Sequence, residues 1–381
     1  MAVLAGQAGR AGRAGRAGRA GRAGRAGRAG RETVSVDEVD LSFSTLVTRE
    51  GILPYWDGTP DLKPVVISKK KHLERLDALA SIPREVLIDD RLFCNFRPRG
   101  NEVICLFLKP DQHGNAQPLV TLESPDHDVF KGSQLKFVRS YADLRADRLD
   151  EIRVQQDDIT SYFASSLKLD AARGEWAFEL LEAVVRLCGY IEFPLKYHFD
   201  LPRPSQYSSK VMPVIETPTH GTWPSGHATE AFAIATVLAG LLQCKQQGGS
   251  VFTMLAAAKD TAAPAALLLR IASRIADNRA IAGVHFPHDG VAGAVLGIAV
   301  GEAVVNYLSG AKSTYTYVLE QLTEEEKEGE DKQYGELSFE ALTALLDPAS
   351  AKEEDFASPD RDDLLEAVWE AACSGMPALL P

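Results

Sequence analysis

The feature that most constrains the fold is a set of apolar helical segments in the second half of the 381-residue chain. Residues 228–242 are apolar on nearly every side of a helix, and residues 265–283 continue in the same way. Residues 288–308 carry a glycine at every fourth position over three turns, which lines one helix face with small residues. A helix that is apolar all round is buried inside a larger structure. The sequence therefore predicts an all-α fold, with closely packed helical bundles.

Residues 176–191 predict a helix of a second kind, in which only one face is apolar. Five side chains follow the spacing of three or four residues that places them on that face: Leu180, Leu181, Val184, Val185 and Cys188. Such a stripe is typical of a helix that covers a core and leaves its other side in water. The uncharged runs of the helical region are short and are interrupted by charged residues, so we expect a soluble protein without a membrane span.

We expect four regions along the chain. Residues 1–31 are dominated by an Ala-Gly-Arg repeat without proline, and glycine at this density opposes a helix, so we expect disorder. Residues 32–135 mix strand-like runs, such as residues 103–108, with turn signals, and predict a smaller mixed N-terminal region. Residues 136–312 predict the helical core. Residues 313–381 are acidic, and we expect a C-terminal tail that is partly ordered and solvated.

The charge distribution argues against a nucleic-acid partner. The net charge is −12, but residues 1–31 hold eight arginines and no acid. The other 350 residues therefore carry a net charge of −20. A body of this charge offers no sustained basic face to a phosphate backbone.

Cysteine usage bears on the compartment. The five cysteines are odd in number, scattered and without any CxxC pair: Cys94, Cys105, Cys188, Cys244 and Cys373. This pattern favours free thiols over zinc ligation or a disulfide framework, and thus a reducing cytoplasm. The N-terminus lacks the apolar stretch of a secretory signal, which agrees with that expectation.

Three short motifs in the helical region place basic residues and histidines in a fixed order. They are Lys-x₆-Arg-Pro at residues 196–204, Pro-Ser-Gly-His at residues 224–227 and Arg-x₅-His-x₃-Asp at residues 279–289. Each motif alone is weak, since a histidine at the end of an apolar helix is more often a hydrogen-bonded core residue. Their conjunction, in this order, points to one binding site.

The residue types suit a tetrahedral oxyanion such as phosphate or vanadate. Lys196, Arg203 and Arg279 supply three positive charges, and the planar fork of an arginine can bind two oxygens at once. Ser225 can donate its hydroxyl, and Gly226 lets its backbone N–H approach closely. Both residues precede an apolar helix, whose free N–H groups and dipole favour an anion. The sequence therefore predicts an oxyanion-binding site.

Two histidines can serve the axis of a trigonal-bipyramidal oxyanion. Of His227 and His285, one can bind the central atom through a ring nitrogen while the other moves protons at the opposite apex. Asp289 lies four residues after His285, so that in a helix it could orient that ring. A second interpretation of Asp289, as the cap of the last core helix, stays open.

These motifs resemble the signature shared by vanadium-dependent haloperoxidases, bacterial acid phosphatases and type 2 phosphatidic acid phosphatases. The resemblance covers roughly residues 150–310 and identifies the helical core as the catalytic part. The one departure is Asn278, where the family pattern has serine. The resemblance implies an all-α fold with helical bundles around an oxyanion or vanadate site.

The resemblance also implies a role for each residue. His285 would be the vanadium ligand of a peroxidase or the phosphorylated nucleophile of a phosphatase, and His227 would be its acid–base partner. Lys196 would polarise the bound peroxide. The equatorial oxygens would be held by the remaining residues of the signature: Lys196, Arg203, Ser225, Gly226 and Arg279.

Three local features favour the haloperoxidase branch. The second motif continues with Ala-Thr, and Gly283-Val284-His285-Phe286 is similar to haloperoxidase sequences. His220 stands at a position that tends to be histidine in bromoperoxidases and phenylalanine in chloroperoxidases, although an ordinary loop histidine is the other interpretation. The resemblance thus implies vanadate as cofactor, with hydrogen peroxide, bromide or iodide and an organic acceptor as partners.

Two other functions stay open. One is a soluble acid phosphatase that acts through a phosphohistidine at His285. The other is a catalytically idle oxyanion-binding or scaffold protein, which the intact pair of His227 and His285 disfavours. The sequence leaves the organic acceptor and a homo-oligomeric state undecided.

Overall fold

The computed structural model describes residues 71–100, 103–108, 118–244, 251–259, 263–311, 313–321 and 361–377, and short stretches at 47–48, 342, 346 and 352–355. The Ala-Gly-Arg repeat lies outside the described residues, as does most of the acidic segment after residue 321.

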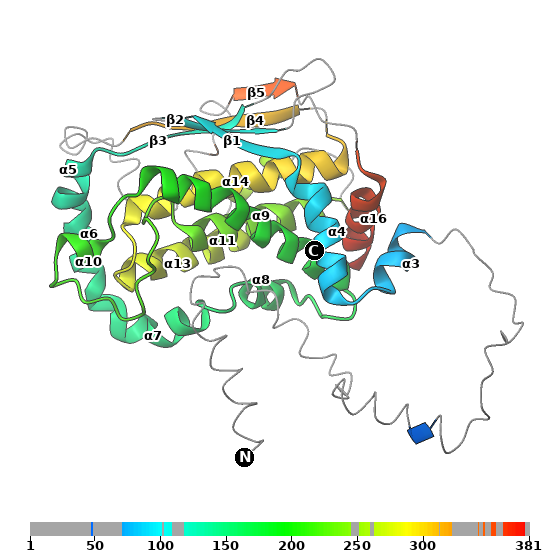
Figure 1. Cartoon of the computed structure of the whole chain (residues 1–381), viewed down its shortest axis with the longest axis horizontal. Helices are drawn as coiled ribbons and strands as arrows, with labels where there is room; N and C mark the ends of the chain where they lie inside the picture. Colours follow the sequence, from blue (N-terminus) through cyan, green and yellow to red (C-terminus); the bar gives the residue numbers. More distant parts are fainter. Residues whose placement is uncertain are drawn as a thin grey trace, which may run out of the picture.

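Four long helices form the centre of the molecule, and their presence confirms the predicted all-α class. They are α9 (Glu175–Phe199), α11 (Gly226–Gln243), α13 (Pro264–Ile281) and α14 (Pro287–Ser309). Helix α11 contacts the other three and is buried along its length, as its apolar sequence predicts (Figure 1). Its closest partner is α14, which is buried from Pro287 to Leu308.

The glycine stripe of α14 sets the distance between these two helices. A Cβ atom at Gly297 would lie 2.9 Å from Cβ of Phe232 in α11, and one at Gly293 would lie 2.7 Å from Cβ of Ala228. Only residues without a side chain fit at this spacing. The structure thus confirms close helix packing at the stripe.

Helix α14 differs in one respect from the sequence expectation. Among the described residues it is the helix that is long and apolar enough to cross a membrane, despite Asp289 and Glu302. All of its apolar window is buried inside the structure. The core helix of a folded domain meets the same criteria of length and composition, so the finding by itself assigns no membrane.

Shorter helices surround this centre. Before it come α3 (His72–Asp77), α4 (Ser81–Phe93), α5 (His127–Val129), a π-helical turn (Phe130–Gln134), α6 (Leu135–Tyr141), a 3₁₀ turn (Ala142–Leu144), α7 (Arg145–Val154) and α8 (Thr160–Leu167). Between and after the long helices lie α10 (Pro204–Tyr207), α12 (Val251–Ala256), a 3₁₀ turn (Ala257–Lys259) and α16 (Asp363–Gly375).

The described strands form one five-stranded sheet that lies along α14 (Figure 1). In order they are β1 (Phe96–Gly100), β2 (Val103–Leu108), β3 (Pro118–Glu123), β4 (Ser313–Leu319) and β5 (Lys352–Asp355). Neighbouring strands are antiparallel except β3 and β4, which pair in parallel. The strand-like run at residues 103–108 is thus a strand, in the region where a mixed composition was expected.

Two segments of the predicted acidic tail contact the helical core. Strand β4 packs on α14 as well as pairing with β3, and α16 packs on α9 through its buried Leu365, Val368 and Trp369. Asp362 caps α16 and accepts a hydrogen bond from Arg91 in α4 at 2.9 Å. The acidic region after residue 312 therefore contains amphipathic segments that bury one face.

One cysteine pair departs from the expectation of free thiols. Cys244, at the end of α11, and Cys373, in α16, form a disulfide whose Cα atoms lie 6.1 Å apart. The two residues are 129 positions apart, so their spacing gives no sign that α16 returns to the end of α11. Cys188 is a buried free thiol and Cys94 an exposed one.

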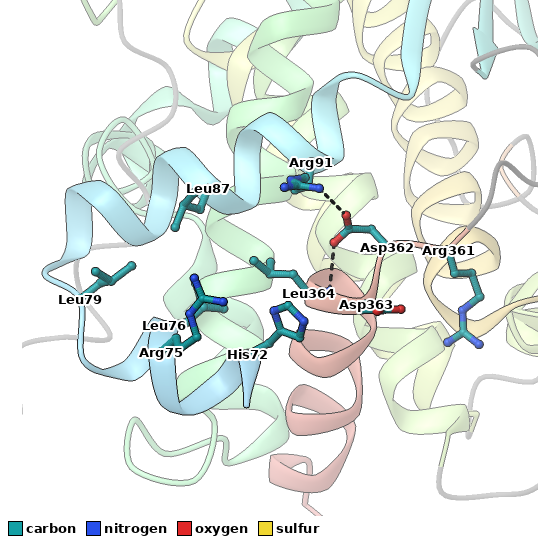
Figure 2. A pocket seen from close by; sticks show the side chains of 10 residues that line it. All are labelled: His72, Arg75, Leu76, Leu79, Leu87, Arg91, Arg361, Asp362, Asp363 and Leu364. Atoms are coloured by element: carbon teal, nitrogen blue, oxygen red, sulfur yellow. Dashed lines mark hydrogen bonds and ion pairs between the residues drawn. The ribbon is translucent and has the colours of Figure 1, made fainter. Parts of the chain in front are cut away.

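A cavity of about 560 Å³ lies between α3, α4 and the start of α16. Its lining includes the apolar Leu76, Leu87 and Leu364 and the basic Arg75, Arg91 and Arg361 (Figure 2). Arg91 and Arg361 are already paired, with Asp362 and Glu366 respectively. None of the predicted site residues lines this cavity.

Candidate oxyanion-binding site

The structure brings the sequence-predicted site residues together at the ends of the four central helices. They are Lys196 in α9, Arg203 before α10, His220 in the following loop, Ser225, Gly226 and His227 at the start of α11, Arg279 in α13, and His285 and Asp289 around the start of α14. His220 and His227 are half-buried and the others are buried. Their roles toward an anion remain predictions, but their gathering in one place is a property of the fold.

His285 is held in one orientation by Asp289. Its Nδ1 lies 2.9 Å from Oδ2 of Asp289 and 3.3 Å from Oγ1 of Thr222. A carboxylate accepts the Nδ1 proton, which leaves the lone pair on Nε2. Nε2 lies 3.0 Å from Nη1 of Arg203, a permanent donor. Burial and the charge of Arg203 lower the pKa of His285 well below its ordinary value, so its imidazole is neutral at pH 7.

Asp289 serves both interpretations that the sequence left open. Its Oδ2 accepts the backbone N–H of Phe286, the residue that precedes α14, at 2.9 Å, and also faces the ring of His285. Burial raises the pKa of Asp289 to about 6, against the lowering effect of the hydrogen bond that the Thr222 hydroxyl donates. The same carboxylate therefore caps the helix and orients the histidine.

Arg203 connects the loop that carries His220 to His285. Its guanidinium donates to three backbone carbonyls, those of His220 (3.2 Å), Gly221 (3.2 Å) and Val284 (2.8 Å). Nη2 also lies 3.2 Å from Nδ1 of His220, whose ring packs edge-on against Phe193. Burial lowers the pKa of Arg203 to about 10, which leaves it charged at neutral pH.

The start of α11 supplies donors of the kind that an anion requires. The Ser225 backbone N–H donates to the carbonyl of Asp289 at 2.9 Å, which fixes α11 against α14. The Ser225 hydroxyl is fully buried and has no hydrogen-bond partner among the described residues. Lys196 donates through Nζ to the carbonyl of Pro224, and burial lowers its pKa to about 8.

Gln155, which sequence reasoning missed, joins the other half of the site. It ends α7, and its backbone carbonyl lies 3.0 Å from Nε2 of His227. Its side-chain Oε1 accepts from Nη2 of Arg279 at 3.1 Å and from Nδ2 of Asn278 at 2.9 Å. Because a carbonyl only accepts, Nε2 of His227 carries the proton and Nδ1 the lone pair. Gln155 lies 124 positions before Arg279 and in no motif, so no sequence signal marks it.

Electrostatics show that His227 and Arg279 share this environment. Burial and the charge of Arg279 lower the pKa of His227 to about 3, so the ring is neutral at pH 7. Burial lowers the pKa of Arg279 to about 10, which leaves it charged. Asn278, which replaces the serine of the family pattern, is fully buried and bonds to Gln155 instead of pointing to solvent. Asn278 thus holds Gln155 beside the site.

Comparison with protein families agrees with this arrangement. Residues 177–312 match the model of the PAP2 superfamily. The chain contains a PAP2 superfamily domain. The superfamily includes haloperoxidases and phosphatases and consists mostly of enzymes. Comparison with curated proteins found no match. The predicted resemblance is therefore confirmed at the level of the superfamily, whose domain here spans α9 to α14.

The PAP2 domain also buries two acids that sequence reasoning did not single out. Glu192 lies in α9, one turn before Lys196, and Glu230 lies in α11, one turn after Gly226. Burial raises the pKa of both carboxyls, and the proximity of Glu192 raises that of Glu230 further. Their spacing of four from predicted site residues is the one sequence signal that could have indicated them.

The donor set of the PAP2 domain fits an oxyanion. Three buried cations converge on it, and two buried donors, the Ser225 hydroxyl and Nε of Arg279, have no protein partner among the described residues. Within those residues no three His, Cys, Asp or Glu side chains lie close enough to hold a metal cation.

Proposed function

We propose that this protein is a vanadium-dependent haloperoxidase that uses hydrogen peroxide to oxidise bromide or iodide and so halogenates organic acceptors. The observation that carries the proposal is the setting of His285. Asp289 fixes its Nδ1 proton, and its Nε2 lone pair faces the cationic Arg203. A nitrogen lone pair beside buried cations is what a vanadate site requires.

The residues present have defined tasks when vanadate is bound. Vanadate would supply a Lewis acid that activates hydrogen peroxide without a change of oxidation state. Lys196, Arg203 and Arg279 would neutralise the anion's oxygens, and the hydroxyl of Ser225 would donate to one of them. The backbone N–H of Gly226 lies in the first turn of α11, where N–H groups have no partner within the helix.

His227 is suited to move a proton. It is neutral at pH 7, its Nε2 proton is engaged by the carbonyl of Gln155, and its Nδ1 holds a lone pair. It can therefore accept a proton from peroxide as the latter approaches the pocket. Bound negative charge raises the pKa of a neighbouring imidazole, which favours retention of that proton until a leaving oxygen needs it.

The position of His220 supports bromide or iodide as the halide. Its Nδ1 lies 3.2 Å from Arg203, which in turn lies 3.0 Å from His285, so its ring borders the anion site. Burial and the charge of Lys196 lower its pKa to about 4, so it offers a neutral hydrogen-bonding ring at neutral pH. The half-buried imidazole replaces the apolar surface that a phenylalanine would give.

The same geometry supports a phosphatase as second candidate. Nε2 of His285, activated by Asp289, is also a competent nucleophile toward phosphorus, and the buried cations match a phosphate monoester. The covalent intermediate would be a phosphohistidine. His227, its pKa raised by the charge of the bound phosphate so that it takes up a proton from water, would pass that proton to the departing alkoxide oxygen.

Two assays run side by side test the choice between haloperoxidase and phosphatase. Protein loaded with vanadate should brominate a phenolic dye in the presence of peroxide and bromide, and hydrolyse p-nitrophenyl phosphate poorly without vanadate. His285→Ala should abolish the bromination, and the exposed His127→Ala should leave it intact. Efficient phosphate release that disappears in His285→Ala, with no halide oxidation by vanadate-loaded protein, would favour the phosphatase instead.

A further inference from the structure

Three residues of α9 form a buried polar stripe toward α11: Cys188, Glu192 and Lys196, each one turn from the next. Lys196 belongs to the anion site, and Cys188 approaches the carbonyl of Thr229 in α11 at 4.0 Å. Glu192 lies between them and is fully buried. Burial of an unpaired carboxylate costs free energy, so the position of Glu192 calls for an explanation.

The carboxyl group of Glu192 lies directly on the first residue of α11. A Cβ atom at Gly226 would be 2.7 Å from each of its oxygens and 3.1 Å from its carboxyl carbon. Neither oxygen has a hydrogen-bond partner among the described residues. The start of α11 is also where the oxyanion is expected, since helix N-termini favour negative charge. Glu192 thus brings a carboxyl of its own to the edge of the anion site.

The charged groups that interact with Glu192 lie in α9, before α10 and in α11. Lys196 in α9 and Arg203 before α10 lower its pKa, while burial raises it. In α11, the proximity of Glu192 raises the pKa of Glu230, and Oε1 of Glu230 has no partner among the described residues either. Of the charges that raise the pKa of Lys196, Glu192 is the largest, ahead of Asp289 and Glu230. Glu192 is therefore the principal countercharge of Lys196.

We propose that Glu192 is an internal competitor of the bound oxyanion: its carboxylate balances Lys196 in the free protein and must take up a proton when an oxyanion binds there. A bound anion would form an ion pair with Lys196. It would also be repelled by an ionised Glu192, in a medium of low dielectric constant. Protonation of Glu192 removes that repulsion. The inference rests on the oxyanion site of the proposed function, and it holds for a peroxidase and a phosphatase alike.

The test is calorimetric binding of inorganic phosphate at pH 6.0, in two buffers of different ionisation enthalpy, which also counts protons. Glu192→Gln keeps the shape over Gly226 and removes the charge. If phosphate binding shifts the pKa of Glu192 by about one unit in the wild type, the variant avoids that cost. It should then bind phosphate more tightly, on the order of tenfold. It should also take up fewer protons than the wild type, by up to about one per phosphate. A residue with a purely structural role would give a loss of affinity or no change.

Two control variants make the result specific. Glu230→Gln removes another buried carboxyl and leaves Glu192 in place, so it should not give the gain. Glu182→Gln removes an acid from the same helix away from the stripe and should bind phosphate as the wild type does. Unchanged or weaker binding by Glu192→Gln, an equal gain in Glu230→Gln, or an identical proton count would overturn the proposal.

The outcomes also separate this inference from the proposed function. If the wild type fails to bind phosphate at millimolar concentration, the oxyanion site itself is wrong, and this inference fails with it. If the wild type binds phosphate and His285→Ala does not, but Glu192→Gln shows no gain, the site stands and the competitor role fails. Thermal unfolding of each variant shows whether it folds, and Glu192→Asp, with a carboxylate withdrawn from Gly226, should give a smaller gain in the same direction.

Discussion

Replacement of Asp289 by asparagine removes the charge that orients His285 and leaves the size of the side chain unchanged. Oδ2 of Asp289 accepts from the Phe286 backbone and from Thr222, and it faces Nδ1 of His285 at 2.9 Å. Because all three contacts involve Oδ2, an asparagine oxygen in that position can still accept them, but a neutral amide holds the Nδ1 proton less strongly than a carboxylate does. The preference of His285 for a proton on Nδ1 therefore weakens, and the Nε2 lone pair becomes less available to an anion.

The expected size of this effect can be estimated in two ways. A hydrogen bond to a charged group contributes about 1.5–3 kcal/mol, which corresponds to roughly 10–150-fold in a binding constant. Loss of a residue that orients a metal-bound histidine typically costs about 10–100-fold in affinity. We therefore expect Asp289→Asn to raise the Kd for vanadate about 10–100-fold at pH 8. Because the pKa of Asp289 is raised to about 6, the difference from wild type should shrink below pH 6, where both side chains are neutral.

Calorimetric titration of purified protein with vanadate provides the measurement. The exposed Asp200→Asn is a matched control, since it makes the same chemical change at the end of α9, in a left-handed conformation (φ 44°) that asparagine tolerates. The reasoning is refuted if Asp289→Asn binds vanadate within twofold of the wild type while His285→Ala does not bind at all. Asp289 would then act solely as the cap of α14.

Three further predictions follow from individual contacts. His220→Ala should keep vanadate bound but lower bromide turnover more than iodide turnover, and equal losses at matched vanadium content would contradict the role of His220. Glu302, which accepts from Tyr317 and the Tyr315 backbone, has its pKa raised by burial to about 7, so the native state binds more protons than the unfolded state between pH 4.5 and 7. Glu302 should therefore contribute a fall in stability of about 3 kcal/mol as pH rises through this window, and urea unfolding of Glu302→Gln should lack that contribution; the same pH slope in variant and wild type would contradict this prediction. Gly297→Ala should destabilise by about 1–3 kcal/mol, whereas Gly189→Ala, whose Cβ would lie 3.8 Å from Phe193, should stabilise by about 0.5–1 kcal/mol; similar effects at both sites would refute the packing argument.

Local pattern was sufficient to predict the helical core. The apolar runs at residues 228–242 and 288–308 became α11 and α14, and the glycine stripe became the surface where the two helices meet. The placement of the motif residues at helix ends was predictable for the same reason, because each motif lies beside the apolar run that forms its helix. Ser225 and Gly226 precede an apolar helix, and that sequence context by itself places their N–H groups at a helix start.

Contacts between distant segments could not be predicted in this way. The parallel pairing of β3 with β4, and the disulfide between Cys244 and Cys373, each join parts of the chain that no local period connects. Gln155 holds His227 and Arg279 through one side chain and one carbonyl, and a single glutamine carries no motif. The contact of the Glu192 carboxyl with Gly226 joins α9 to α11, and no local pattern predicts it.

The most direct test of the account is the structure of the protein crystallised with vanadate. We predict vanadium bonded to Nε2 of His285, with its oxygens within about 2.7–3.2 Å of donors from Lys196, Arg203 and Ser225. Nδ1 of His285 should remain on Asp289, and His227 should lie at the opposite apex. Vanadate bound elsewhere, or a pocket that stays free of it at a concentration that saturates binding in solution, would contradict the central claim that these helix ends form one oxyanion site.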